Sequence, residues 1–291
     1  MSAQIWTILA VLKWSENFLR EKNIASPKHD AEELLSFVLG YSRLDLYLHF
    51  DQPLTTAERG RYKELLLRRA KHEPLQYITG AAWFLSKKYK VTLHTLIPRY
   101  DTEILAETVL KYIDRAEVLI DLGTGSGILA IALAERCKKV YALDISSEAL
   151  SVAAENARTH GVADKIEFIQ SDLLAGLPEE AARSAGGVFL VSNPPYISPD
   201  EYAELEPEVR DYEPKTALWA DDAGLTFYKK ILAQAAVLGQ NLRGVFFETG
   251  WRQARAVAEL MQERFAVPAQ IVKDLGGKER TVYTLLEEGK S

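Results

Sequence analysis

Residues 193–196 of the chain, Asn-Pro-Pro-Tyr, combine side-chain types that could hold a planar nitrogen for chemistry. They follow an apolar run over 188–191 that is typical of a buried parallel strand. The two prolines must end that strand, because proline has no N–H for a sheet ladder. Asn193 is therefore expected at the carboxyl end of a strand, the edge at which open α/β sheets bind ligands. A proline-rich turn without function would have the same sequence. The residues at the other strand ends must show whether this loop belongs to a binding site.

Such a loop could hold an amide or aromatic amine while a chemical group is transferred to its nitrogen. The lone pair of such a nitrogen is delocalised, which makes it a poor nucleophile. If the Asn193 side-chain oxygen and the Pro194 carbonyl each accept one N–H, they localise the lone pair and stabilise the positive charge that develops in the transition state. Pro194 and Pro195 would orient that carbonyl, and Tyr196 would offer a flat face to a planar group. We predict Asn193, Pro194 and Tyr196 as catalytic residues.

A glycine-rich segment, residues 121–127 (Asp-Leu-Gly-Thr-Gly-Ser-Gly), follows an earlier apolar run. Gly123 and Gly125 let the backbone turn tightly and let a ligand approach closely. The dinucleotide fingerprint would require its third glycine at position 128, which is Ile128, whereas here it comes one residue earlier, at Gly127. This spacing disfavours a dehydrogenase and favours a nucleoside without a pyrophosphate. A plain strand-to-helix turn is the alternative for this segment taken alone.

Two acids follow the next two apolar runs. Asp144 comes directly after residues 140–143, where its carboxylate could accept the hydroxyls of a ribose, and Asp172 follows residues 166–169, where it could accept from an adenine amino group. A glycine loop and two acids at three successive strand ends indicate S-adenosylmethionine as the cofactor. No metal is expected. The residues predicted from this array to bind the cofactor are Asp121, Gly123, Thr124, Gly125, Ser126, Gly127, Asp144 and Asp172.

Composition narrows the class of protein. The 291 residues, 47% of them hydrophobic and 26% charged, are enough for about two ordinary globular domains. A net charge of -6 argues against a protein that binds duplexes by neutralising phosphates, so direct nucleic-acid binding is not expected. The single cysteine, Cys137, suits a reducing compartment. The apolar stretch near the N-terminus, interrupted by Lys13, is too short to span a bilayer. We therefore expect a cytoplasmic protein with no membrane partner.

Three regions follow from the periodicity. Residues 1–72 repeat apolar side chains at three- and four-residue spacing, and residues 55–58 resemble a capping start, which predicts a small helical-bundle domain. Residues 73–98 are a connector with a β-hairpin, whose strands are expected to be joined by residues 86–88. Residues 99–291 form the third region, which begins with a helix to about Ile113.

The third helix of the first region carries many basic side chains. Two interpretations are open: a solvated helix face, or a docking surface for an acidic partner. The residues concerned are Arg59, Arg61, Lys63, Arg68, Arg69, Lys71 and His72.

In the third region, short apolar runs alternate with amphipathic helical patterns, which predicts βαβ units and a doubly wound, mostly parallel sheet. The final two runs are separated by residues 273–280, too few for a crossover helix, so they should form an antiparallel C-terminal hairpin. The predicted strands lie at 118–120, 140–143, 166–169, 188–191, 245–247, 269–272 and 281–285.

Several segments occur in an order that resembles one known family. They are residues 73–80 (Glu-Pro-Leu-Gln-Tyr-Ile-Thr-Gly), 96–103 (Leu-Ile-Pro-Arg-Tyr-Asp-Thr-Glu), the glycine loop, 193–196, 209–214, 222–225 and 273–277. Asn-Pro-Pro-Tyr alone indicates only methylation of a planar nitrogen. The ordered set resembles the PrmC/HemK family, the release factor glutamine methyltransferases, over essentially the whole chain. The resemblance implies the seven-stranded fold of S-adenosylmethionine-dependent methyltransferases, preceded by a helical domain for substrate recognition.

The activity that the resemblance implies is transfer of a methyl group from S-adenosylmethionine to the side-chain amide of the glutamine in the Gly-Gly-Gln motif of class I peptide chain release factors. These release factors are then the expected protein partner. By motif match, Leu173 and Asn193 join the cofactor-binding residues, and the substrate amide falls on Asn193, Pro194, Pro195 and Tyr196. Arg99 and Glu103 either form an ion pair at the start of a helix or belong to the wall that admits the substrate loop.

Two other functions are compatible with the sequence. A related methyltransferase could act on a ribosomal-protein glutamine or on adenine in nucleic acid. A non-catalytic, cofactor-binding regulator would require degeneration at Asn193, Asp144 or the glycines, and all of these are intact.

Overall fold

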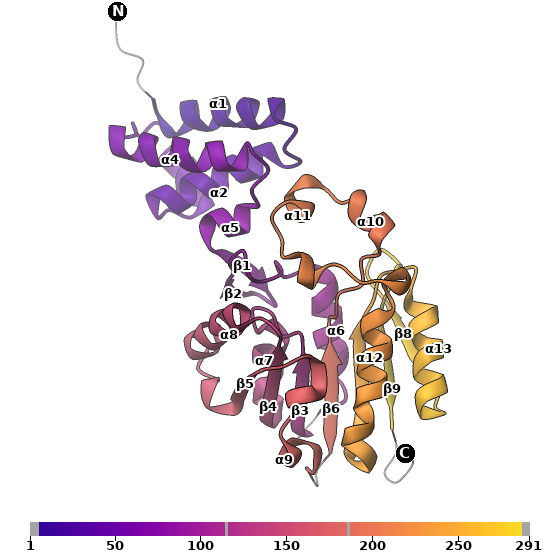
Figure 1. Ribbon diagram of the computed structural model, residues 1–291. Helices are drawn as coiled ribbons and strands as arrows, with labels where there is room; N and C mark the ends of the chain where they lie inside the picture. Colours follow the sequence, from indigo (N-terminus) through magenta and orange to yellow (C-terminus); the bar gives the residue numbers. More distant parts are fainter. Residues whose placement is uncertain (1–5, 114–115, 185–186, 287–291) are drawn as a thin grey trace, which may run out of the picture. The chain divides into compact units, whose positions relative to one another are not determined.

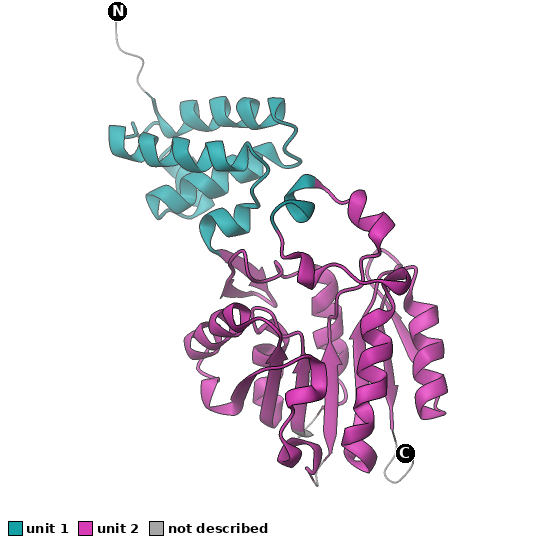
Figure 2. Ribbon diagram, in the orientation of Figure 1, with its two compact units in different colours: residues 1–80, 207–212 teal, residues 81–206, 213–291 magenta. Residues whose placement is uncertain are grey.

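The computed structural model describes residues 6–113, 116–184 and 187–286, so the ends of the predicted regions at 1–5 and 287–291 lie outside the described residues. The chain divides into two compact units (Figures 1 and 2). Unit 1 is Met1–Gly80 with Pro207–Tyr212, and unit 2 is Ala81–Glu206 with Glu213–Ser291. The boundaries at 72 and 98 proposed for the three regions remain predictions.

Unit 1 is helical. Thr55 and Glu58 form the capping box at the start of the fourth helix, which confirms the predicted start signal, because side chain and backbone satisfy each other's free N–H groups. Leu19, Leu34 and Leu66 are fully or almost fully buried between the helices. The helices are α1 (Ile8–Glu21), α2 (Pro27–Leu39), α3 (Arg43–Leu48), α4 (Thr56–Arg69), α5 (Leu75–Thr79) and α11 (Pro207–Arg210).

The basic helix α4 is not a uniform solvated face. Arg69 is buried and pairs with Asp30 at 2.6 Å and with Glu208 at 2.7 Å. Asp30 is itself 4% exposed, so each charge depends on the other for its neutralisation. Arg68, one residue earlier, pairs with Glu73 at the surface. Only part of the basic stretch is therefore available to a partner.

Unit 2 begins with a hairpin of β1 (Ala81–Phe84) and β2 (Lys87–Lys90). The strands are joined by Leu85 and Ser86 rather than by residues 86–88 as expected. Both turn residues have positive φ, 46° and 61°, which suits a tight two-residue turn whose twist matches the strands. The Glu103 carboxylate accepts the Leu85 N–H at 2.6 Å, which stabilises this backbone conformation.

The sheet of unit 2 has seven strands in the order β5-β4-β3-β6-β7-β9-β8. The first five are parallel, and β9 runs antiparallel to both β7 and β8. The predicted doubly wound, mostly parallel sheet with an antiparallel C-terminal hairpin is confirmed. The strands are β3 (Ala116–Leu122), β4 (Cys137–Asp144), β5 (Ile166–Gln170), β6 (Val188–Ser192), β7 (Leu242–Glu248), β8 (Gln270–Lys273) and β9 (Glu279–Leu285).

Helices cover both faces of this sheet (Figure 1). Alternate strand residues point to opposite faces: Leu119 packs with α6, α7 and α8, whereas Ile120 packs with α12 and α13. Both side chains are fully buried, which explains why the strands read as unbroken apolar runs. The helices of unit 2 are α6 (Tyr100–Leu110), α7 (Ile128–Leu133), α8 (Ser147–Thr159), α9 (Glu179–Ala182), α10 (Pro199–Ala203), α12 (Thr226–Gln234) and α13 (Ala254–Phe265).

The register of the parallel strands aligns their carboxyl ends. Leu122 pairs with Leu143 on one side and with Ser192 on the other, and Ser192 pairs with Phe247. The residues one position further along are therefore neighbours in one line across four strands. We call this line the edge row; its members are Asp144, Gly123, Asn193 and Glu248. The chain order reverses between β3 and β6, so the topological switch point of the sheet lies within the edge row.

The Arg69 ion pair leads to a prediction about stability. Replacing Arg69 by methionine leaves the buried Asp30 carboxylate unpaired and should lower the free energy of unfolding of unit 1 by about 3–5 kcal/mol. Arg68→Met, which removes a partly exposed pair, should cost at most about 1 kcal/mol. Urea denaturation followed by circular dichroism measures both. Equal losses for the two variants would contradict the structural role given to Arg69.

Candidate active site

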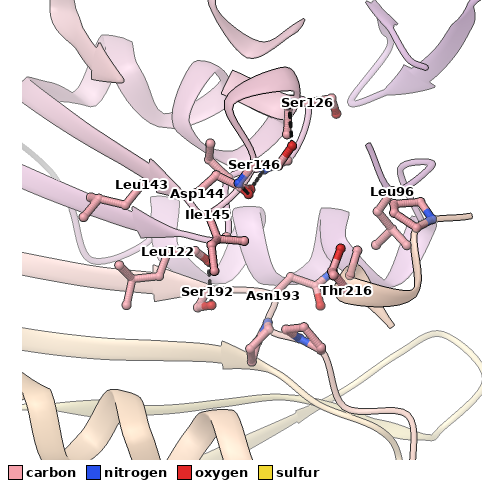
Figure 3. Close-up of a pocket in the computed structure, with 18 of the residues that line it drawn as sticks. Leu96, Leu122, Ser126, Leu143, Asp144, Ile145, Ser146, Ser192, Asn193 and Thr216 are labelled. Carbon is pink, nitrogen blue, oxygen red and sulfur yellow. Dashed lines mark hydrogen bonds between the residues drawn. The ribbon is translucent and has the colours of Figure 1, made fainter. Parts of the chain in front are cut away.

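A cavity of about 530 Å³ opens at the carboxyl ends of β3, β4, β5 and β6. This volume lies within the range of small-molecule sites. Figure 3 shows Asp144, Ile145 and Asn193 among the side chains around it. Three members of the edge row, Gly123, Asp144 and Asn193, line the cavity, so the structure brings the predicted glycine loop, the first acid and the asparagine together.

The glycine loop is shaped by backbone conformations that other residues adopt poorly. Gly123, Gly125 and Gly127 have φ of 69°, 55° and 83°. A Cβ on Gly123 would meet no atom within 4 Å, whereas a Cβ on Gly127 would lie 3.0 Å from that of Ala153. Gly123 thus keeps the cavity open, and Gly127, which is outside the cavity lining, allows the loop to pack against α8.

Asp121 holds the same loop from below. Its carboxylate accepts the Thr124 hydroxyl at 2.7 Å and the Ala130 N–H at 3.1 Å, and it does not line the cavity. The side chain is 1% exposed. Burial raises the pKa of this carboxyl to about 7, against the opposing effect of the two hydrogen bonds. Asp121 therefore shapes the cofactor loop from inside the core, whereas Thr124 and Ser126 line the cavity themselves.

Asp144 faces the cavity from the end of β4. One carboxylate oxygen accepts the Gly125 N–H at 2.8 Å and the other accepts the Ser146 N–H at 2.9 Å. Burial raises the pKa of Asp144, although these backbone hydrogen bonds favour its charged form. The next residue, Ile145, is 61% exposed and lines the cavity, so an apolar side chain lies beside the acid.

The second acid also reaches the cavity. Asp172 is exposed and lines the cavity together with Leu173, whose backbone has a positive φ of 53°. The buried Ser171 supports this turn, because its hydroxyl donates to the Leu173 carbonyl at 2.8 Å and accepts the Gly176 N–H at 2.8 Å. Both residues thus lie where the sequence predicted them, on the loop after β5.

Some side chains of the Asn-Pro-Pro-Tyr loop line the cavity, and one packs against the core. Asn193, Pro194 and Pro195 line the cavity, and Tyr196 does not. The Tyr196 hydroxyl donates to Glu248 at 3.3 Å, and its carbonyl accepts the Gln253 side-chain N–H at 2.8 Å. Tyr196 therefore anchors the loop to the end of β7 and to the segment before α13.

Arg99 and Glu103 lie outside the cavity lining. The Arg99 guanidinium donates to the buried Glu213 carboxylate, which also accepts the Ile97 N–H at 3.1 Å. Glu103 holds the β1–β2 turn through Leu85. The two side chains have different partners and do not form the ion pair that one interpretation expected.

Several lining residues were not predicted. Thr102 belongs to the 96–103 segment, in which the sequence indicates only Arg99 and Glu103 as candidate site residues. Ile145 could have been found as the apolar residue directly after a strand-end acid. Leu96 lies in the same 96–103 segment. No local sequence signal marks His94, Thr216, Trp219 and Phe227, which also line the cavity.

Within 6–113, 116–184 and 187–286, no group of three or more His, Cys, Asp or Glu side chains is arranged to hold a metal ion. No helix among these residues has the length and apolar character to cross a membrane.

Known families match both units. The PrmC N-terminal domain matches residues 10–80, and a methyltransferase domain matches residues 113–192. Among solved structures, the catalytic domain of hMettl16 in complex with MAT2A 3'UTR hairpin 1 has a TM-score of 0.54 at 16% identity, covering 89% of this chain and 93% of that one. At this identity the likeness concerns the fold alone. The domain match assigns residues 113–192 to a methyltransferase domain.

Curated relatives extend over nearly the whole chain. The release factor glutamine methyltransferase of Geobacter sulfurreducens is 36% identical, covering 96% of each chain. Those of Chlorobaculum tepidum and Bacillus subtilis are 38% and 34% identical, covering 95% and 98% of this chain and 96% and 99% of theirs. The chain belongs to the release factor glutamine methyltransferase family, which confirms the resemblance found in the sequence.

The burial of Asp121 predicts a pH dependence of stability. In the folded protein the Asp121 carboxyl keeps its proton up to about pH 7, whereas an unfolded aspartate releases its proton at about pH 4. Between these values the folded state binds more protons, so stability should fall as the pH rises through this window and level off above it. Asp121→Asn can keep both hydrogen bonds and should make the fall shallower. Urea midpoints measured across the window check this, and identical slopes for the variant and wild type would refute it.

Proposed function

We propose that the protein transfers the methyl group of S-adenosylmethionine to the side-chain amide nitrogen of the glutamine in the Gly-Gly-Gln motif of class I peptide chain release factors. The observation that carries this proposal is the placement of Asn193 beside Gly123 in the edge row. A ligand held on the glycine loop and an amide held by Asn193 would then meet at the switch point of the sheet. The full-length relatives support the choice of glutamine over other planar nitrogens.

The cavity fits the cofactor. Its glycine loop leaves open space where a Cβ would otherwise project from Gly123, and Asp144, Asp172 and the apolar Ile145 lie along its rim. Asp144 would bind the ribose hydroxyls, Asp172 the adenine amino group, and Leu173 and Ile145 the faces of the base. Asp121, Thr124, Ser126 and Gly127 would keep the loop in shape. When bound, the cofactor supplies an electrophilic methyl group on a sulfonium.

The amide clamp consists of the Asn193 side-chain oxygen and the Pro194 carbonyl. Each would accept one N–H of the glutamine amide, which would localise the nitrogen lone pair and stabilise the positive charge that develops there. Pro194 and Pro195 restrict the backbone at this point. Two further roles remain predictions. One is a flat contact between the Tyr196 ring and the substrate, and the other is a place for Arg99 and Glu103 beside the substrate loop.

The substrate is a protein, which requires a larger recognition surface than the cavity. We propose that unit 1 supplies it. The helix α3 and the residues after it expose large apolar side chains, with Leu44, Leu48 and Phe50 at 67%, 64% and 50% exposure. Exposed apolar residues that lie close together in sequence are typical of binding surfaces.

The proposal predicts the identity of the methylated atom. Incubation of the protein with cofactor labelled on its methyl group and a purified class I release factor should place one label on the Gly-Gly-Gln glutamine, identified by mass spectrometry. Replacing that glutamine by alanine should abolish the label. Label that persists in the alanine variant, or that appears in a ribosomal protein or in adenine of a cell extract while the release factor stays unlabelled, would contradict the assignment.

A further inference from the structure

Glu248 is the one member of the edge row that does not line the cavity. It ends β7, and the pairing of Ser192 with Phe247 places it next to Asn193. Glu248 is 1% exposed, and it follows the buried Phe246 and Phe247 on the same strand. A buried carboxylate is costly unless its oxygens accept hydrogen bonds. The groups that donate hydrogen bonds to this carboxylate therefore indicate what it does in the structure.

Thr102 connects Glu248 to Asn193. The Thr102 side chain, from the first turns of α6, is 1% exposed, and its hydroxyl donates to Glu248 Oε2 at 2.6 Å. A threonine hydroxyl has a single proton, so toward any other neighbour it can act only as an acceptor. The neighbour is Asn193, whose Nδ2 donates to Thr102 Oγ1 at 3.2 Å.

This arrangement decides which way the Asn193 amide faces. With Nδ2 bound to Thr102, the side-chain oxygen Oδ1 is on the other side of the amide and accepts no hydrogen bond from the described residues. The reverse orientation would place Oδ1 against a hydroxyl whose proton is already used by Glu248, which would leave both oxygens without a donor.

We propose that Glu248 and Thr102 are positioning residues that fix the rotation of the Asn193 amide, so that its oxygen is presented to the N–H of the substrate. The inference rests on the proposed amide clamp and deepens it. Asn193 contacts the substrate, whereas Thr102 acts on Asn193, and Glu248 acts through Thr102. Tyr196 stabilises the other carboxylate oxygen, since its hydroxyl donates to Glu248 Oε1 at 3.3 Å.

The charge state of Glu248 follows from its surroundings. Burial raises the pKa of Glu248, the nearby Asp101 carboxylate adds to the rise, and the hydrogen bonds from Thr102 and Tyr196 together with Arg280 oppose it, so that the pKa lies at about 7. Arg280 pairs with Asp101 at 3.1 Å and with Asp274 at 3.3 Å, and the Tyr228 hydroxyl donates to the Glu248 carbonyl at 2.8 Å. Below about pH 7 the carboxyl becomes a donor, and the Thr102 proton is free to turn toward Asn193. The amide orientation should therefore be lost as the pH falls.

A kinetic experiment uses two threonines of the same helix. Thr102→Val removes the hydroxyl with little change in shape, and kcat at saturating cofactor should fall by about 10- to 100-fold, as expected for a misplaced catalytic group. Cofactor affinity, measured by calorimetry, should be unchanged. Thr102→Ser should recover most of kcat. Thr108→Val is the matched control, because Thr108 is 2% exposed and its hydroxyl makes no hydrogen bond among the described residues, so kcat should stay at the wild-type level.

Nuclear magnetic resonance tests the hydrogen-bond relay from Glu248 through Thr102 to Asn193 without any substrate. In protein labelled with ¹⁵N on asparagine, the side-chain amide signal of Asn193, assigned by its absence from Asn193→Ala, should shift with a midpoint near pH 7. The shift should persist in Asp121→Asn, because Asp121 is a separate buried acid of similar pKa. It should also persist in Thr108→Val. It should be absent from Thr102→Val and from Glu248→Gln.

The outcomes separate this inference from the proposed function. If wild type methylates glutamine but Thr102→Val keeps its kcat, or if the Asn193 signal in wild type does not change across pH 7, the relay is wrong and the amide clamp stands. If the signal titrates as described but no release factor is methylated, the relay stands and the assigned substrate is wrong. Because the wild-type titration requires no variant at Thr102, a failure of that variant to fold would still leave the relay open to refutation.

Discussion

The register between neighbouring strands is the constraint on which the site depends. Pairing of Leu122 with Leu143 and with Ser192 places the residues that follow them side by side at one edge of the sheet. A slip of one residue in β6 would turn Asn193 to the other face of the sheet and bury it among helices. The apolar side chains on both faces oppose such a slip, because Leu190 and Val191 are fully buried on opposite sides. Core packing therefore fixes the distance between the glycine loop and the asparagine.

Two buried acids, one in the core and one in the edge row, support the loops. Asp121 binds the glycine loop and the start of α7, and Glu248 binds Thr102 and Tyr196. Burial raises the pKa of each to about 7, so both are partly protonated near neutral pH. Their charge is tolerated because hydroxyl and backbone donors face them. The same bonds hold the loops rigid, which links the stability of the sheet edge to the geometry of the site.

Features that depend on one strand and the residue after it could be predicted from the sequence. The strand ends at Asp144 and Asn193 follow from apolar runs that stop at a polar residue, and the glycine loop follows from spacing. The positioning role of Thr102 could not be predicted, because it arises from contacts with Asn193 and Glu248, each far away in sequence. Arg69 belongs to a basic helix for which the sequence leaves a solvated face and a docking surface both open, because composition does not reveal that Asp30 faces it across the helices.

The proposed function depends on Asn193 as the residue that joins cofactor and substrate at the switch point. The most direct test is single-turnover methyl transfer by Asn193→Ala, with cofactor affinity measured by calorimetry on the same preparation. We predict a loss of at least about 100-fold in the transfer rate at saturating cofactor, comparable to the removal of a transition-state hydrogen-bonding group. Near-normal transfer by a variant that still binds cofactor would contradict the central role given to the edge row.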